Sequence, residues 1–138
     1  MDERRLRLAR EWLAKASHDL QNARIVGAVP GGPLDTAIYH CQQAAEKAVK
    51  GWLAYQGVAF EKTHDVAGLV AQAADIESRF LAWKGAAAIL TPYASAFRYP
   101  GLAVEPMPSQ GELQEALGHA QGIYDFVLGL LPPQAKGD

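Results

Sequence analysis

Between Tyr39 and Lys50, side chains able to transfer protons or bind anions recur at helical spacing. At about 100° per residue, one side of this helix carries Tyr39, His40, Gln43, Glu46, Lys47 and Lys50. Glu46 and Lys50 have the i,i+4 order that favours an ion pair. The pattern leaves two interpretations open. The side chains form either a ligand-binding face or a solvated face with one weak surface ion pair.

A second group of residues that could bind a ligand lies near Arg98, at the expected end of a helix. An arginine there can bind the last carbonyls of the helix and complement its dipole. It can equally grip a phosphate, with the rings of Tyr93 and Tyr99 beside it able to stack on a base. His64 either orders the loop before a short helix or faces the same cleft as Arg98.

Metal binding is not expected from the distribution of histidines. The chain has four, scattered along its length: His18, His40, His64 and His119. They show no metal-ligand spacing and Cys41 points away from His40 around the helix, so we expect no metal site and no cofactor.

The helix that carries the first group has a broad apolar side as well. That side is formed by Ala37, Ile38, Cys41, Ala44, Ala45, Ala48, Val49, Trp52 and Leu53. An arc this wide predicts the central helix of a bundle, with neighbours on more than one side. Cys41, the single cysteine, is predicted to be a buried and unreactive thiol.

Helical periodicity predicts five helices and no strand. The first is expected over residues 4–26, ended by the proline- and glycine-rich segment 27–33. Asp35 or Thr36 is expected to cap the second, which reaches about Gln56, with Gly57 in a left-handed conformation. Thr63 is expected to cap a short third helix.

The fourth helix is expected over residues 78–97, with a kink at Pro92 or a break one residue earlier. The last begins at a capping box of Ser109 and Glu112, and two prolines stop it before a frayed tail over residues 134–138. The predicted fold class is all-α, an antiparallel up-and-down bundle of four long helices plus one short helix, with residues 1–138 in a single domain.

Composition narrows the class of protein. The 138 residues carry a net charge of −2, which disfavours sequence-independent binding to long nucleic acids but allows a small basic site. No apolar run approaches the roughly 20 residues of a membrane span, and the N-terminus lacks a signal-peptide core, so a cytoplasmic location without membrane contact is expected.

The wide apolar arc, with Trp52, Leu81 and Trp83, predicts a homodimer.

Four segments together resemble the HEPN superfamily, small all-α domains of higher eukaryotes and prokaryotes named for nucleotide binding. The segments are Trp12–Leu20, Cys41–Lys50 with Leu53, Thr63–Leu69, and Phe97–Pro100. The resemblance implies a homodimer with a shared cleft near the ends of the second and fourth helices. It also implies a partner that is a minimal nucleotidyltransferase, in a toxin–antitoxin or defence module.

Catalytic members of this superfamily are metal-independent ribonucleases that carry an arginine followed, a short gap later, by a histidine. Arg98 matches the arginine, but no histidine occurs between it and His119, so the resemblance leaves enzymatic activity open. The leading interpretation is a protein that binds a nucleotide or RNA phosphate and pairs with a nucleotidyltransferase. The expected ligand-binding residues are Arg98, Tyr99, Tyr93, Gln43, Lys47, Glu46 and Lys50.

Two alternatives stand beside that interpretation. The first is a ribonuclease toxin in which Arg98 stabilises the phosphate charge and His64 or His40 replaces the missing base. The second is a purely structural dimerisation partner.

Overall fold

The structure is a computed structural model that describes residues 2–101 and 106–136. Its elements are α1 (Glu3–Ala28), α2 (Leu34–Tyr55), α3 (Val66–Ile76), the 3-10 turn η1 (Ser78–Trp83), α4 (Lys84–Leu90), η2 (Thr91–Ala94), α5 (Gln110–Leu130) and η3 (Pro133–Lys136). No strand occurs in these ranges, and the predicted all-α bundle is confirmed. Across the same ranges, no helix is both long and apolar enough to cross a membrane.

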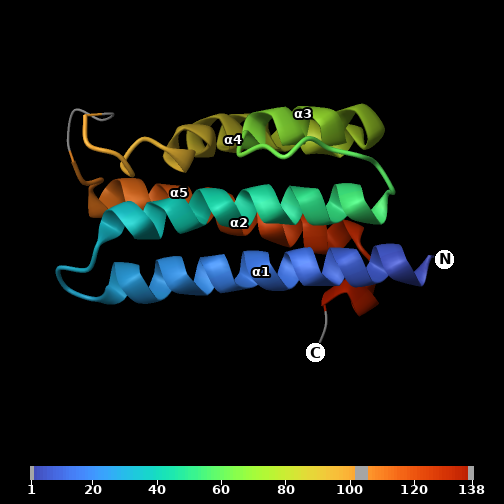
Figure 1. The fold of residues 1–138 in the computed structure, drawn as a ribbon, viewed down its shortest axis with the longest axis horizontal. Helices are drawn as coiled ribbons and strands as arrows, with labels where there is room; N and C mark the ends of the chain where they lie inside the picture. Colours follow the sequence, from blue (N-terminus) through green and yellow to red (C-terminus); the bar gives the residue numbers. More distant parts are fainter. Residues whose placement is uncertain (1, 102–105, 137–138) are drawn as a thin grey trace.

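The central helix of the bundle is α2, as its apolar arc predicted. In Figure 1 it runs between α1 on one side and α3 with α4 on the other, alongside α5. From Cys41 to Leu53 every residue of α2 except Lys47 is buried. Cys41 has no exposed surface, and burial raises the pKa of its thiol to about 12. Its predicted burial is therefore confirmed.

Small residues let α1 approach α2 closely. At Gly51, an added Cβ would lie 3.0 Å from the Cβ of Trp12 and 3.4 Å from the carbonyl oxygen of Ala9. The neighbouring alanines of α2, Ala44, Ala45 and Ala48, are fully buried. This close packing fixes the two helices in the register that brings their polar residues together.

Some helix ends follow their predicted signals. Ser109 and Glu112 form the expected capping box, and each side chain accepts the other's backbone N–H at 3.0 Å. Gly57 has the expected left-handed conformation, with φ of 72°. At both positions the local sequence alone satisfies the orphan backbone groups of a helix end.

The predicted caps of α2 and α3 are wrong. Helix α2 already begins at Leu34, and the hydroxyl of Thr36 donates back to the carbonyl of Pro33 instead of accepting a backbone N–H. Helix α3 is capped by Asp65, which accepts the N–H of Gly68 at 3.0 Å. Thr63 lies too early to cap α3, and its hydroxyl accepts the N–H of Asp65.

The fourth segment was expected as a helix over residues 78–97 interrupted at Pro92, and it is divided further than that. It consists of η1, α4 and η2, followed by turns over residues 95–98. The predicted break one residue before Pro92 is present, because α4 ends at Leu90 and Thr91 is its C-cap. Proline has no N–H to continue the helix. The hydroxyl of Thr91 instead donates to the carbonyl of Ala87 and accepts the N–H of Ala67 in α3.

The predicted frayed tail is wrong for residues 134–136, and residues 137–138 lie outside the described chain. Residues 133–136 form η3, in which Ala135 is buried. The guanidinium of Arg10 donates two N–H groups to the carbonyl of Gln134, at 2.9 and 2.7 Å. The C-terminal turn is therefore docked on α1.

The three residues named in the homodimer prediction, Trp52, Trp83 and Leu81, differ in their exposure. Trp52 is buried within one chain, against Phe80 at a ring separation of 4.8 Å. Trp83 is half-buried beside Phe126. A single bundle therefore covers more apolar surface than the sequence suggested, and Leu81, with 55% of its surface exposed, is the outward-facing member of the three.

Candidate functional site

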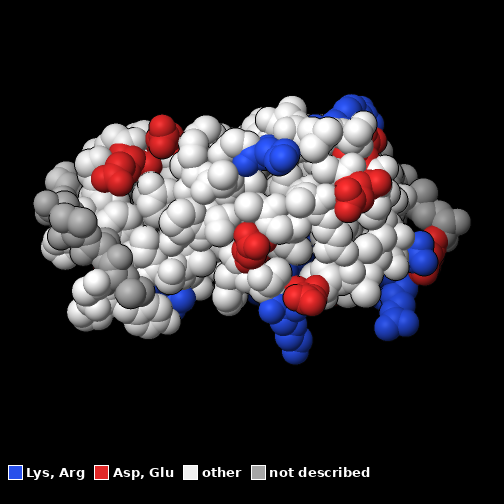
Figure 2. Space-filling view, turned by 90° about the horizontal axis from the view of Figure 1, so that it is seen from above, with Lys and Arg blue, Asp and Glu red and all other residues white. Residues whose placement is uncertain are grey.

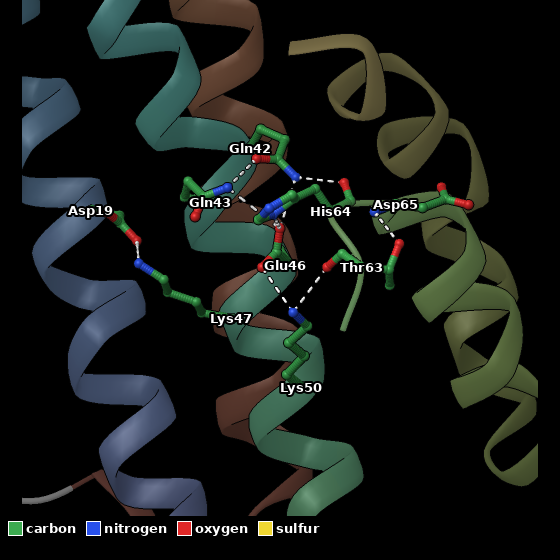
Figure 3. Close-up of polar contacts among 9 residues, drawn as sticks. All are labelled: Asp19, Gln42, Gln43, Glu46, Lys47, Lys50, Thr63, His64 and Asp65. Atoms are coloured by element: carbon green, nitrogen blue, oxygen red, sulfur yellow. Dashed lines mark hydrogen bonds and ion pairs between the residues drawn. The ribbon is translucent and has the colours of Figure 1, made fainter. Parts of the chain in front are cut away.

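The polar side of α2 holds a buried ion pair (Figure 3). The Nζ of Lys50 lies 3.0 Å from Oε2 of Glu46, and only 8% and 4% of the two side chains are exposed. Lys50 also donates to the carbonyl of Thr63 at 2.9 Å, and its ammonium lies 5.6 Å from the Trp12 ring centre. The ion pair was predicted, but its interpretation as a weak surface pair is wrong, because the segment before α3 covers it.

The second oxygen of Glu46 joins the same cluster to the segment before α3. Oε1 of Glu46 lies 2.9 Å from Nδ1 of His64 and accepts the amide of Gln42 at 3.2 Å. The Gln42 amide also donates to the carbonyl of His64 at 2.8 Å, and Gln43 donates to Oε1 of Gln42 at 2.7 Å. We call Gln42, Gln43, Glu46, Lys50 and His64 the Glu46 cluster.

Gln42 is a member of this cluster that sequence reasoning missed. It has no exposed surface and lies where the apolar and polar arcs of α2 meet. A buried amide requires partners for its polar atoms, and the backbone of His64 together with Gln43 provides them. The signal was the pair of adjacent glutamines on a helix predicted to be surrounded by others.

A second buried carboxylate, Asp19, comes from α1. Its Oδ1 lies 2.8 Å from Nδ1 of His40, and its Oδ2 accepts Nζ of Lys47 at 2.7 Å. Burial by itself would raise the pKa of Asp19, but the hydrogen bonds and charges of His40 and Lys47 outweigh it and lower that pKa. We call these three residues the Asp19 cluster.

Sequence reasoning did not select Asp19, although a signal was present. Asp19 follows Ala16 by three residues and precedes Ala23 by four, so it lies at the edge of the buried stripe of α1. An ionised carboxylate is only an acceptor, so His40 must carry its proton on Nδ1. Its Nε2 has no hydrogen-bond partner among the described residues, and 29% of the His40 side chain is exposed.

Arg98 belongs to a third group, in the turn after η2. Its guanidinium carbon lies 4.2 Å from the ring centre of Tyr39 and 5.4 Å from that of Tyr99. Tyr93 instead stacks on Phe97 at 5.9 Å, so the ring beside Arg98 that was expected from Tyr93 comes from Tyr39 on α2. Within residues 2–101 and 106–136, the guanidinium donates no hydrogen bond to a protein acceptor, so the capping contact is not made.

Two cavities adjoin Arg98, and both are lined by Asp35, Phe97 and Arg98. The larger, of about 420 Å³, is completed by Ala96, Tyr99, Pro100, Gly101 and Pro106. The smaller, of about 120 Å³, is completed by Thr36 and Tyr39. They lie at the N-terminal end of α2, where the helix dipole favours an anion.

The predicted site residues thus fall into three groups, with Tyr93 apart from them on Phe97. Arg98 contacts the rings of Tyr39 and Tyr99. His40 and Lys47 bind Asp19, and Gln43, Lys50 and His64 surround Glu46. Edge-to-face contact of Tyr39 with His40, at 5.8 Å between ring centres, joins the first group to the second. Among the described residues, no three His, Cys, Asp or Glu side chains converge as metal ligands would.

The comparisons with known proteins agree with this architecture. The HEPN domain family matches residues 9–130 of the chain. The crystal structure of TT1696 from Thermus thermophilus is similar with a TM-score of 0.76 and 31% sequence identity, over 89% of this chain and 98% of that one. ST0689, an archaeal HEPN homologue, is similar with a TM-score of 0.70 and 28% identity, over 88% and 96% of the two chains.

A comparison with curated protein sequences gave no match. The family match spans most of the chain, and the structural similarity extends over nearly all of both solved proteins. The chain belongs to the HEPN domain family.

Proposed function

We propose that this HEPN domain binds the phosphate of a nucleotide or of RNA, and that Arg98 is the residue that grips it. The observation that carries the proposal is an exposed guanidinium that lines two cavities while its N–H donors have no protein acceptor among the described residues. A phosphate offers this planar fork a charge-assisted, bidentate contact.

The neighbours of Arg98 support the same role. Cation–π contact with Tyr39 at 4.2 Å restrains the guanidinium before any ligand arrives, which lowers the entropy lost on binding. The exposed ring of Tyr99 offers a surface for a base. Tyr93 contributes indirectly, because it stacks on Phe97 in the wall of both cavities.

The polar side of α2 has a supporting role in this proposal. In the Glu46 cluster, Glu46, Lys50 and Gln43 are engaged with each other, with Gln42 and with the segment before α3. Lys47 and His40 are partly exposed and extend the site toward α1. A ligand held by Arg98 would reach them across Tyr39.

Calorimetric titration tests the phosphate-binding role. ATP and a short single-stranded RNA are titrated into the wild type, Arg98→Ala and Arg98→Lys. Loss of a charge-assisted contact of about 1.5–3 kcal/mol weakens binding by about 10- to 100-fold, with little change in melting temperature, and lysine rescues only part of it. Arg7→Ala is the matched control, because Arg7 is exposed and lies in the first turns of α1, and the N-terminal end of α1 is at the opposite end of the bundle from the turns after η2 (Figure 1). Equal affinities in all four proteins would contradict the proposal.

The proposal includes two protein partners, a second copy of this chain and a nucleotidyltransferase-domain protein, in a toxin–antitoxin-like module. The face over α3 and α4 is largely uncharged, with charges of both signs scattered across it (Figure 2). Three exposed apolar residues lie on this segment of the chain: Ile76 on α3, Leu81 on η1 and Ile89 on α4. The nucleotidyltransferase partner follows from the family resemblance. Co-purification with the product of a neighbouring nucleotidyltransferase gene tests it, and an isolated gene would count against it.

A specific geometry favours ribonuclease activity as a second candidate. In the Asp19 cluster a carboxylate orients His40 through Nδ1, which is the arrangement of a general base and its orienting group. His64 on Glu46 is a second imidazole of this kind. Cleavage of labelled single-stranded RNA, compared among the wild type, His40→Gln and His64→Gln, tests this candidate. Cleavage that persists in both variants, or is absent from the wild type, would exclude it.

A further inference from the structure

A carboxylate in the proposed phosphate site calls for an explanation. Asp35 lines both cavities beside Arg98, yet among the described residues no ion pair joins the two side chains. A carboxylate repels phosphate, so a ligand that fills this space must present hydrogen-bond donors to Asp35 and its phosphate to Arg98. The two side chains therefore fix both the chemistry and the direction of the ligand.

The acceptors of Asp35 are only partly used. Oδ1 accepts the N–H of Thr36 at 2.8 Å, and Oδ2 accepts no hydrogen bond within the described residues. A carboxylate has about four lone-pair sites, so Asp35 can accept two further N–H groups that point in the same direction. Aromatic side chains, Tyr99 and Phe97, lie in the wall of the larger cavity and can stack on a planar ring.

Among the nucleobases, guanine offers two adjacent N–H groups on one edge, N1–H and the N2 amino group. Adenine presents an acceptor, N1, beside its N6 amino group and would place a lone pair against the carboxylate. We infer that the ligand is a guanine nucleotide, with its base against Asp35 and its phosphate on Arg98. This inference rests on the proposed function, and the cavity of about 420 Å³ lies within the usual range of ligand sites.

Titration with a set of nucleoside diphosphates tests which base the site prefers. GDP, IDP, which lacks the N2 amino group, and ADP are titrated into the wild type. The expected order of affinity is GDP, then IDP, then ADP. GDP should exceed ADP by about 10- to 100-fold, as expected for a bidentate contact with a base edge. Equal affinities for GDP and ADP would overturn the inference.

Asp35→Asn provides a test that a loss of folding cannot imitate. Asparagine keeps the oxygen that accepts the Thr36 N–H but replaces the other acceptor with a donor. The variant should bind GDP more weakly and xanthosine diphosphate, which has an oxygen in place of the N2 amino group, more tightly than the wild type does. An equal change for every nucleotide would overturn the inference.

The two proposals fail in different ways. Binding that depends on Arg98 but is the same for all bases would refute guanine recognition and leave phosphate binding intact. Failure of any nucleotide or RNA to bind would refute both. Two uridine-rich RNA hexamers, one with a single guanosine and one with a single adenosine, show whether the bound guanine belongs to RNA or to a free nucleotide. Preference for the guanosine hexamer assigns the base to RNA, and equal binding together with a preference for GDP assigns it to the free nucleotide.

Discussion

At the scale of single residues, the main feature is a pair of buried carboxylates, each of which has both of its oxygens bound by neighbouring side chains. Glu46 lies between Lys50, His64 and Gln42, and Asp19 lies between His40 and Lys47. Burying an ion costs several kcal/mol, which only good geometry and additional hydrogen bonds offset. These contacts join α2 to α1 and to the segment before α3. They hold His40, whose ring contacts Tyr39, the ring on which Arg98 lies.

The Glu46–Lys50 pair gives the first prediction. Glu46→Gln leaves the ammonium of Lys50 buried without its anion, and we expect the free energy of unfolding to fall by about 3–5 kcal/mol. The double variant Glu46→Gln, Lys50→Met removes the unpaired charge and should lose less than Glu46→Gln alone. Urea unfolding measures both variants. A loss below about 1 kcal/mol for Glu46→Gln would instead match an exposed pair.

Asp19 gives a prediction about pH. Its folded pKa is lowered by His40 and Lys47, so the unfolded state binds its proton more readily. The stabilisation is complete above the unfolded pKa of about 3.9 and is lost as pH falls from there through the lower folded pKa. We expect the difference in unfolding free energy between the wild type and Asp19→Asn to shrink between pH 6 and pH 3. A difference that stays constant with pH would contradict this account.

At the scale of elements, the position of α2 could be predicted from sequence but the surroundings of its polar face could not. Periodicity separates apolar from polar residues, and the simplest reading places the polar ones in solvent. Asp19, 28 positions from Lys47, and His64, 18 positions from Glu46, cover that face instead. Pairing over such distances depends on how helices and loops pack, which local patterns do not encode.

The ends of elements show the same division. The capping box at Ser109 and the left-handed conformation of Gly57 could be predicted from the sequence, because each depends on only a few adjacent residues. The 3-10 turn η1 was not, since its residues also suit an α-helix and Phe80 within it packs between Trp52 and Phe126. Arg98 was identified from sequence, but its ring partner Tyr39 is 59 positions away, and Tyr93 was chosen in its place.

The contact between α1 and α2 predicts the effect of a small substitution. Gly51→Ala gains helix propensity of up to about 1 kcal/mol, but its methyl group would lie 3.0 Å from the Cβ of Trp12, which the backbone holds in place. We expect a net loss of about 1–3 kcal/mol in urea unfolding. Gly118→Ala on α5 should be stabilising, because the new methyl group would have nothing within 4 Å apart from the adjoining part of its own helix. Stabilisation by both substitutions would show that the helices can move apart freely.

At the scale of the whole molecule, the homodimer is a prediction about one face. Light scattering at micromolar concentration should give twice the chain mass of 14.9 kDa. If the face over α3 and α4 forms the contact, Leu81→Asp should yield monomers, because it would bury an unpaired charge. Leu8→Asp, at an exposed leucine on α1, is the control and should stay dimeric. A wild-type monomer at high concentration would refute the dimer.

The central claim is that Arg98 holds the phosphate of a bound nucleotide. A crystal structure determined after soaking with a nucleoside diphosphate tests it most directly. We expect a phosphate oxygen at about 2.7–2.9 Å from the guanidinium nitrogens, the usual length of a charge-assisted hydrogen bond, with Arg98 still lying on Tyr39. A nucleotide bound elsewhere, or an Arg98 guanidinium engaged with a protein carbonyl while the nucleotide is bound, would contradict the account.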